Sequence, residues 1–373
     1  MDCGATEVSA AGIAHCKRLA SLFAEPQKLD VLSVTEWDTL IRIARRGNTL
    51  GKLAECAQHT TLNTALPGAI GNTLQSALTL SHRQERAIRW EIQCLRDALA
   101  DADIPLVLLK GAAYLARGIP AAKGRLYSDV DILVPLERIS DAESSLMKAG
   151  WASTHHDAYD QRYYREWMHE IPPMKHWRRG TVVDVHHRIL PRTAQYDPDP
   201  KRMLAAADPV GDMPGVFTLS AIDMLLHSAT HLFHEGELPN GFRDLLDIDA
   251  LYRRLAALPD FPASLHTRAK ELELTEPLAL ALRYAHRLLG TPSDKPAGST
   301  PRQKMLDWMY LRALHPHHPL LDTAGALAAR LGLYIRAHWL RMPPHLLARH
   351  LGRKAWMRLF PEPDPQLEKK EGP

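Results

Sequence analysis

Two aspartates on a predicted strand are the residues best suited by type and spacing to do chemistry. In the segment SDVDILV, apolar residues alternate with Asp129 and Asp131, which predicts a β-strand. Side chains two positions apart on a strand leave the same face, so the two carboxylates would lie close together. They repel each other unless a cation joins them, and Mg²⁺ prefers oxygen ligands. The pair therefore favours metal-assisted phosphoryl chemistry.

A third acid, Asp184, lies in a second predicted strand, VVDVH, between apolar residues on both sides. An ionised acid is costly to bury without a partner. If this strand neighbours the strand of Asp129 and Asp131, the three acids converge and would bind two metal ions about 3.5 to 4 Å apart. The alternative is that Asp129 and Asp131 are ordinary acids of an edge strand, which is the more frequent meaning of an isolated pair.

The residues around the pair suggest a nucleotide site. The apolar run IPLVLLKG predicts a strand that ends at Lys110 and Gly111, and AAYLARG predicts a helix directly after it. Glycine allows the backbone to approach a phosphate closely, and amides at a helix start attract anions. Positive charge and a hydroxyl lie near the acids at Lys123, Arg125 and Ser128. The predicted nucleotide-binding residues are Lys110, Gly111, Ala112, Arg125 and Ser128.

The remaining sequence predicts an α+β fold, with a small mixed β-sheet forming a nucleotidyltransferase core between two helical parts. Apolar residues recur at helical spacing before position 100 and again after Pro191, and strand patterns are concentrated between these limits. Further strands are predicted at 151–154, 170–177 and 181–189, with a turn at 178–180. The predicted domains are an N-terminal helical region (1–100), the core (101–192), a C-terminal helical bundle (193–360) and a disordered tail (361–373).

The motifs resemble those of the DNA polymerase beta-like nucleotidyltransferase superfamily, and within it the bacterial family described only as uncharacterised nucleotidyltransferases. The resemblance rests on LLKGAA, GRLYSDVDILV and VVDVHHRI, and more faintly on HSATHLFH and FRDLLDIDAL, between positions 105 and 255. It implies a catalytic, metal-binding trio at Asp129, Asp131 and Asp184, with Gly111 in a loop that cradles the triphosphate.

One position departs from the superfamily pattern. Most active members have serine, or glycine and serine, after the loop glycine, whereas Ala112 and Ala113 follow Gly111 here. The hydroxyl contact to phosphate is lost, and charge-assisted contacts from Lys110 and Arg125 would replace it.

Histidines close to these motifs are auxiliary candidates. His186 lies two residues after Asp184, on the same strand face, and either orients that acid or is a satisfied histidine at the sheet edge. His227, His231 and His234 share one helix face. Zinc binding with Glu235 is one interpretation, but there is no HExxH motif, and we favour a role for His231 in lining the nucleotide cleft.

A helical motif and a basic segment complete the candidates. Arg243, Asp244 and Asp247 would reach the base or the acceptor, or else form a solvated helix start. Between residues 323 and 360 there are basic and aromatic residues but no acid. This segment would contact anionic lipid peripherally, bind nucleic acid or contact an acidic partner, or simply face solvent.

Bulk composition excludes several classes of protein. The 373 residues are 45% hydrophobic and 24% charged, which excludes a disordered chain, and a net charge of +3 does not by itself indicate a nucleic-acid partner. Four scattered cysteines suggest reduced thiols. No apolar run reaches the ~18 residues of a transmembrane helix, and the start lacks a secretory signal pattern. We therefore expect a cytoplasmic location.

Together, the sequence predicts an enzyme that moves a nucleoside monophosphate from a nucleoside triphosphate, with ATP preferred, to an unidentified hydroxyl acceptor. Two Mg²⁺ ions, or Mn²⁺ in their place, would serve as cofactors. The alternative is a catalytically inactive protein of the same fold that binds a nucleotide or a partner.

Overall fold

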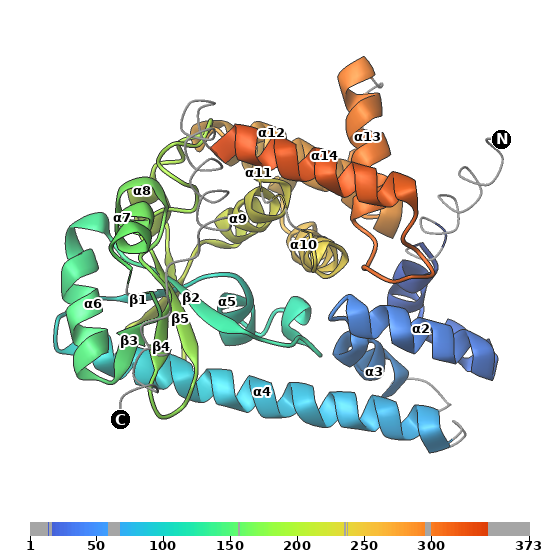
Figure 1. Ribbon diagram of the computed structural model, residues 1–373, viewed down its shortest axis with the longest axis horizontal. Helices are drawn as coiled ribbons and strands as arrows, with labels where there is room; N and C mark the ends of the chain where they lie inside the picture. Colours follow the sequence, from blue (N-terminus) through green and yellow to red (C-terminus); the bar gives the residue numbers. More distant parts are fainter. Residues whose placement is uncertain are drawn as a thin grey trace, which may run out of the picture.

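The computed structural model describes residues 14, 17–58, 68–155, 157–234, 236, 238–294 and 300–341. It contains one seven-stranded mixed sheet flanked by helices, which confirms the predicted α+β class (Figure 1). No helix within these ranges has the length and apolar character needed to cross a bilayer. Cys56 and Cys94 are free thiols, as predicted.

The sheet has the strand order β3-β4-β5-β2-β1-β7-β6. Strands β2 and β5 pair in parallel, as do β1 and β7, and the other neighbours are antiparallel. The strands are β1 (Leu106–Leu108), β2 (Asp129–Leu133), β3 (Trp151–Ser153), β4 (Met174–His176), β5 (Val182–His186), β6 (Asp208–Pro209) and β7 (Val216–Thr218).

Two of these strands correct the prediction of a helical bundle after Pro191. Strands β6 and β7 extend the sheet, with Val216 of β7 paired to Leu106 of β1. Both strands are too short for an alternating pattern to stand out in the sequence. Their pairing with β1, more than a hundred positions earlier in the chain, is a tertiary contact.

The N-terminal helices lead to the sheet through one long helix. They comprise η1 (Pro26–Val31), α2 (Val34–Arg46), α3 (Leu50–Gln58) and α4 (Gly68–Ala100). Helix α2 begins with a capping box formed by Ser33 and Glu36. Helix α4 runs from the N-terminal helices to the sheet (Figure 1). Its first half therefore contributes to the hydrophobic core of the helices, and its second half contributes to the core around the sheet.

Short helices connect the strands of the sheet. They are α5 (Lys110–Ala116), η3 (Pro120–Ala122), η4 (Leu136–Arg138), α6 (Ile139–Lys148) and α7 (Ala158–Trp167). The predicted helix after β1 corresponds to α5, and η4 and α6 follow β2. The predicted turn at 178–180 joins the antiparallel strands β4 and β5.

The remaining helices form the C-terminal part. They are α8 (Pro200–Ala205), α9 (Ala221–His234), α10 (Gly241–Leu255), α11 (Phe261–Glu271), α12 (Thr275–Leu289), α13 (Pro301–Ala313) and α14 (Ala324–Arg341). Helix α9 contributes Leu225 to the core around the sheet and Phe233 to the core of the helices. The division into domains stays a prediction, and the tail 361–373 lies outside the described residues.

Candidate active site

Strand pairing brings the three predicted acids together. Asp131 of β2 lies opposite Asp184 of β5 in the parallel register, and Asp129 is two positions earlier on β2. The intervening residues, Val130, Ile132, Val183 and Val185, are completely buried. Because successive side chains alternate between faces, burial of these valines and isoleucine turns all three acids to the opposite face. We call Asp129, Asp131 and Asp184 the acid cluster.

The strand order excludes two interpretations that place site residues at the edge of the sheet. Strand β2 lies between β5 and β1, and β5 lies between β4 and β2. The interpretation of Asp129 and Asp131 as edge-strand acids is therefore wrong, and so is that of His186 as a histidine at the sheet edge.

One carboxyl oxygen of Asp184 has no polar partner among the described residues. This oxygen, Oδ1, is buried and accepts no hydrogen bond from them. Burial, followed by the carboxylates of Asp131 and Glu170, raises the pKa of Asp184 to about 7. Burial and the Asp131 carboxylate also raise the pKa of Asp129. The acid cluster therefore favours either a proton or a cation.

Asp131 is the ionised member of the cluster. It is 5% exposed, and its Oδ1 accepts a hydrogen bond from Lys110 Nζ at 2.7 Å and lies 3.0 Å from His186 Nε2. Burial opposes its ionisation, yet the Lys110 ammonium and the His186 imidazole hold the pKa of Asp131 well below its usual range. Lys110, predicted to bind phosphate, thus neutralises a carboxylate in this structure.

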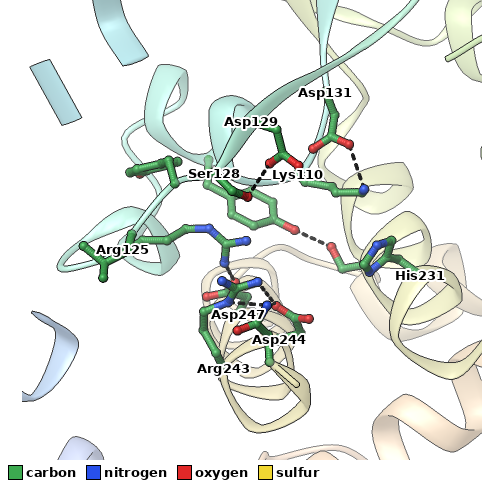
Figure 2. A pocket seen from close by; sticks show the side chains of 15 residues that line it. Lys110, Arg125, Ser128, Asp129, Asp131, His231, Arg243, Asp244 and Asp247 are labelled. Atoms are coloured by element: carbon green, nitrogen blue, oxygen red, sulfur yellow. Dashed lines mark hydrogen bonds and ion pairs between the residues drawn. The ribbon is translucent and has the colours of Figure 1, made fainter. Parts of the chain in front are cut away.

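A pocket opens beside the acid cluster, between the sheet and helices α9 and α10 (Figure 2). Asp129 and Asp131 line it from the sheet side, whereas Asp184 is not among its lining residues. The helical wall, as we name the opposite side, consists of His231 from α9 and of Arg243, Asp244 and Asp247 from α10. The pocket is also lined by Lys110, Gly111, Tyr114, Arg125, Leu126, Tyr127, Ser128, Ser228 and Asn240.

The predicted phosphate ligand Arg125 is part of a buried ion network. Its guanidinium donates to Asp247, and the ammonium of Lys52 lies 3.1 Å from the same carboxylate. Asp247 is 2% exposed, so the interpretation of this acid as part of a solvated helix start is wrong. Arg243 contacts the neighbouring Asp244 at 2.8 Å. Lys52 was missed from the sequence, because it lies on α3, far from every motif.

The residues of the predicted phosphate loop differ in where they lie. Gly111 lines the pocket, and a Cβ there would lie 2.8 Å from Arg125 Nε and 3.2 Å from the Tyr127 ring. Ala112 instead packs in the hydrophobic core, 2% exposed, so its side chain does not contribute to the pocket. Ser128 Oγ donates to Asp129 Oδ1 at 2.9 Å.

Among the described residues, the α9 histidines are not grouped as the ligands of a metal ion would be. His231 lines the pocket, and burial together with Lys110 lowers the pKa of His227 to about 3, which keeps that ring neutral. His234 packs edge-on against Tyr196, and Glu235 lies outside the described residues. Within the described ranges, three ligand atoms come within 4.8 Å of one another only in the group His169, Glu170 and His186.

The acid cluster fits a hard divalent cation by its chemistry. All its donors are carboxylate oxygens, and one of them, Asp184 Oδ1, is buried without a partner. In the described part of the chain, the three aspartates do not all bring an oxygen within 4.8 Å of one another. A shared cation would therefore have to draw them closer.

The basic segment 323–360 is described only up to Arg341, within α14. Arg330 contacts Asp322 at 2.5 Å, and Arg336 donates to the carbonyl of Phe233 at 2.9 Å. These two side chains therefore serve internal contacts. Binding of nucleic acid or a membrane surface by this segment stays a prediction, and residues 342–360 lie outside the described part.

The fold and the site define an α+β protein whose sheet presents clustered carboxylates beside a pocket that also holds lysine and arginine. The family described as uncharacterised nucleotidyltransferase matches residues 33–290, and the chain belongs to this family. The match extends beyond positions 105–255 to the N-terminal helices from α2 onward. No curated protein and no solved structure matches the chain. Membership indicates a transferase that acts on a nucleotide.

Proposed function

We propose that the protein transfers a nucleoside monophosphate from a nucleoside triphosphate, ATP in the first place, to an acceptor hydroxyl. One observation carries the proposal: Asp131 and Asp184 are in register on neighbouring parallel strands, with Asp129 on the same face. Convergent carboxylates of this kind are what a two-metal phosphoryl-transfer site requires. A cytoplasmic location, where nucleoside triphosphates are abundant, belongs to the same proposal.

Each residue of the site has a proposed role. Asp129 and Asp131 would bridge two Mg²⁺ ions, or Mn²⁺ ions, and Asp184 would hold one of them. Bound Mg²⁺ supplies Lewis acidity to phosphate oxygens and to the acceptor hydroxyl. Asp184, which lies opposite Asp131, would also help to deprotonate the acceptor hydroxyl.

The cations of the pocket would position the triphosphate. Lys110 and Arg125 both line the pocket, and their charge complements phosphate oxygens. Gly111 leaves space beside Arg125 that any side chain would fill. His186 would hold Asp131 in place through the contact at 3.0 Å. His231, Arg243 and Asp247 would face the base or the acceptor from the helical wall.

The test is release of pyrophosphate from each of the four nucleoside triphosphates with Mg²⁺, in the presence of fractionated cell extract as the acceptor source. We expect Asp129→Asn to abolish release and label transfer. Asp141→Asn is the matched control, because Asp141 is an exposed acid on α6 whose ion-pair partner within the described ranges is Arg138. Equal activity of wild type and Asp129→Asn would refute the proposal.

A second candidate is a protein that binds a nucleotide or a partner without turnover. It is favoured by the ion pairs of Lys110 with Asp131 and of Arg125 with Asp247, which use the pocket cations internally. The absence of serine directly after Gly111 also favours this candidate. This candidate predicts calorimetric binding of ATP by wild type, with no pyrophosphate release in any extract fraction.

A further inference from the structure

A second group of ligand-type side chains lies directly behind the acid cluster. His169, Glu170 and His186 each offer one ligand atom, and these atoms all lie within 4.8 Å of one another. The backbone fixes this arrangement. Glu170 forms an antiparallel bridge with His186, the amide of Ile171 donates to the carbonyl of Val185 at 3.1 Å, and the amide of His187 donates to the carbonyl of His169 at 2.9 Å.

Two nitrogen atoms of this group lack the partners that buried polar atoms normally have. Nδ1 of His169 and Nδ1 of His186 are both buried, and neither has a hydrogen-bond partner among the described residues. The His186 side chain is only 3% exposed. An unsatisfied buried nitrogen costs about 1–3 kcal/mol, and two in one place call for an explanation.

One pair of this group has the spacing of two ligands around a metal ion. His186 Nδ1 lies 3.4 Å from Glu170 Oε2, beyond the usual range of a hydrogen bond between nitrogen and oxygen. Two ligands that are each about 2.0–2.1 Å from a tetrahedral zinc ion are about 3.4 Å apart. The pair is therefore already spaced as zinc ligands are.

The other nitrogen of His186 supplies the support that metal-binding histidines usually have. Nε2 lies 3.0 Å from Asp131 Oδ1. The Asp131 carboxylate accepts at Nε2, so Nδ1, which faces Glu170, is the atom of this ring that is available to a metal ion. A carboxylate that accepts from the distal nitrogen of a ligand histidine is a common support of zinc sites. The His169 ring stacks on His186, with 5.2 Å between ring centroids.

We propose that His169, Glu170 and His186 bind a zinc ion. Two imidazoles and one carboxylate are a zinc ligand set, whereas Mg²⁺ takes oxygen ligands. The Glu170 side chain is 16% exposed, which leaves access for the ion and for a water as fourth ligand. Zinc on Nδ1 holds His186 with its Nε2 proton toward Asp131, so the ion positions an acid of the neighbouring cluster. Zinc binding itself does not depend on nucleotidyl transfer.

The test measures zinc retained by the full-length protein. The protein is stripped with EDTA, incubated with ZnCl₂, separated from free ion by gel filtration and analysed by mass spectrometry of the metal. Wild type should retain about one zinc ion per chain, and His169→Ala and Glu170→Gln should each weaken binding by more than about 100-fold. Circular dichroism confirms that the variants fold.

Two control variants separate this site from its neighbours. His234→Gln alters a buried histidine of α9 and should retain zinc fully. Asp129→Asn alters the acid cluster, and it should retain zinc even if transfer activity is lost or was never present. The proposal is overturned if wild type retains no zinc, if His169→Ala retains as much as wild type, or if retention depends on Asp129 instead. Co²⁺ in place of Zn²⁺ should give the visible absorption of tetrahedral coordination in wild type and not in Glu170→Gln.

Discussion

The acid cluster and the helical wall both contain buried aspartates, but their partners differ. In the acid cluster, Asp131 has Lys110 and His186, while Asp184 Oδ1 has no hydrogen-bond partner among the described residues. On the helical wall, Asp247 forms ion pairs with both Arg125 and Lys52, although its Oδ1, 3.1 Å from Lys52 Nζ, has no hydrogen-bond partner among the described residues. One side of the pocket therefore has negative charge to share with a cation from outside. The other side is neutralised by the protein's own side chains and holds α3, α10 and the loop before β2 together.

Replacing a buried aspartate by asparagine should affect activity in the acid cluster and stability in the helical wall. Asp184→Asn should give the largest change, in transfer activity. We expect transfer activity to fall by on the order of 10³-fold, because a metal ligand is lost. The free energy of unfolding should stay constant or rise, since the removed charge had no buried partner. Pyrophosphate release and urea unfolding without divalent ions measure the two quantities. A variant that unfolds more easily than wild type would show that Asp184 is structural.

Asp247→Asn should instead lower stability. It leaves Arg125 and Lys52 buried with no carboxylate between them, and breaking a buried pair in this way costs about 3–5 kcal/mol. Urea unfolding measures the loss. Asp244→Asn is the control on the same helix, because Asp244 contacts only the adjacent Arg243 as an ion pair among the described residues, and it should cost less because one cation rather than two loses its partner. Equal losses in both variants would remove the contrast between the regions.

A buried histidine of α9, His234, should make the folding stability depend on pH. Burial, followed by Arg336 and Arg341, lowers the pKa of His234 to about 4. The unfolded chain takes up the proton at a pKa of about 6.5, so the neutral ring favours the folded state above that pH, and this stability is lost as the pH falls toward 4.

His234→Gln should remove this pH dependence. Between about pH 7 and about pH 4.5, wild type should lose on the order of 2 kcal/mol more than the variant. Urea unfolding at both pH values gives the difference, in which the titration of all other groups cancels. Parallel curves for the two proteins would contradict the prediction.

Gly111 lies where the two regions meet, and Gly111→Ala should have the smallest effect. The new Cβ would lie 2.8 Å from Arg125 Nε, so the guanidinium must shift. We expect KM for the nucleotide to rise roughly tenfold, at a stability cost of about 1 kcal/mol. Gly68→Ala is the control, since no atom lies within 4 Å of its added Cβ. An unchanged KM would mean that Arg125 serves only the ion network.

Local patterns predicted the parts of the molecule whose signals are local. The alternation in SDVDILV and VVDVH predicted β2 and β5, and apolar residues at helical spacing before position 100 predicted the N-terminal helices, α4 among them. Strands β6 and β7 were not predicted, because two or three residues are too few to show the alternation of apolar and polar residues typical of a strand. The contact between Lys52 and Asp247 was not predicted either, because in the sequence a lysine on an amphipathic helix looks like any exposed lysine.

The sequence by itself determined which residues carry the chemistry: a spacing of two on a strand places Asp129 and Asp131 on one face wherever that strand lies. Only the tertiary structure decided what each charge is used for. The parallel register sets Asp184 against Asp131, and the packing of α10 turns Arg125 toward Asp247 rather than leaving it free. The physical reason is that the fate of a buried charge depends on partners brought together by folding, and those partners are distant in the chain.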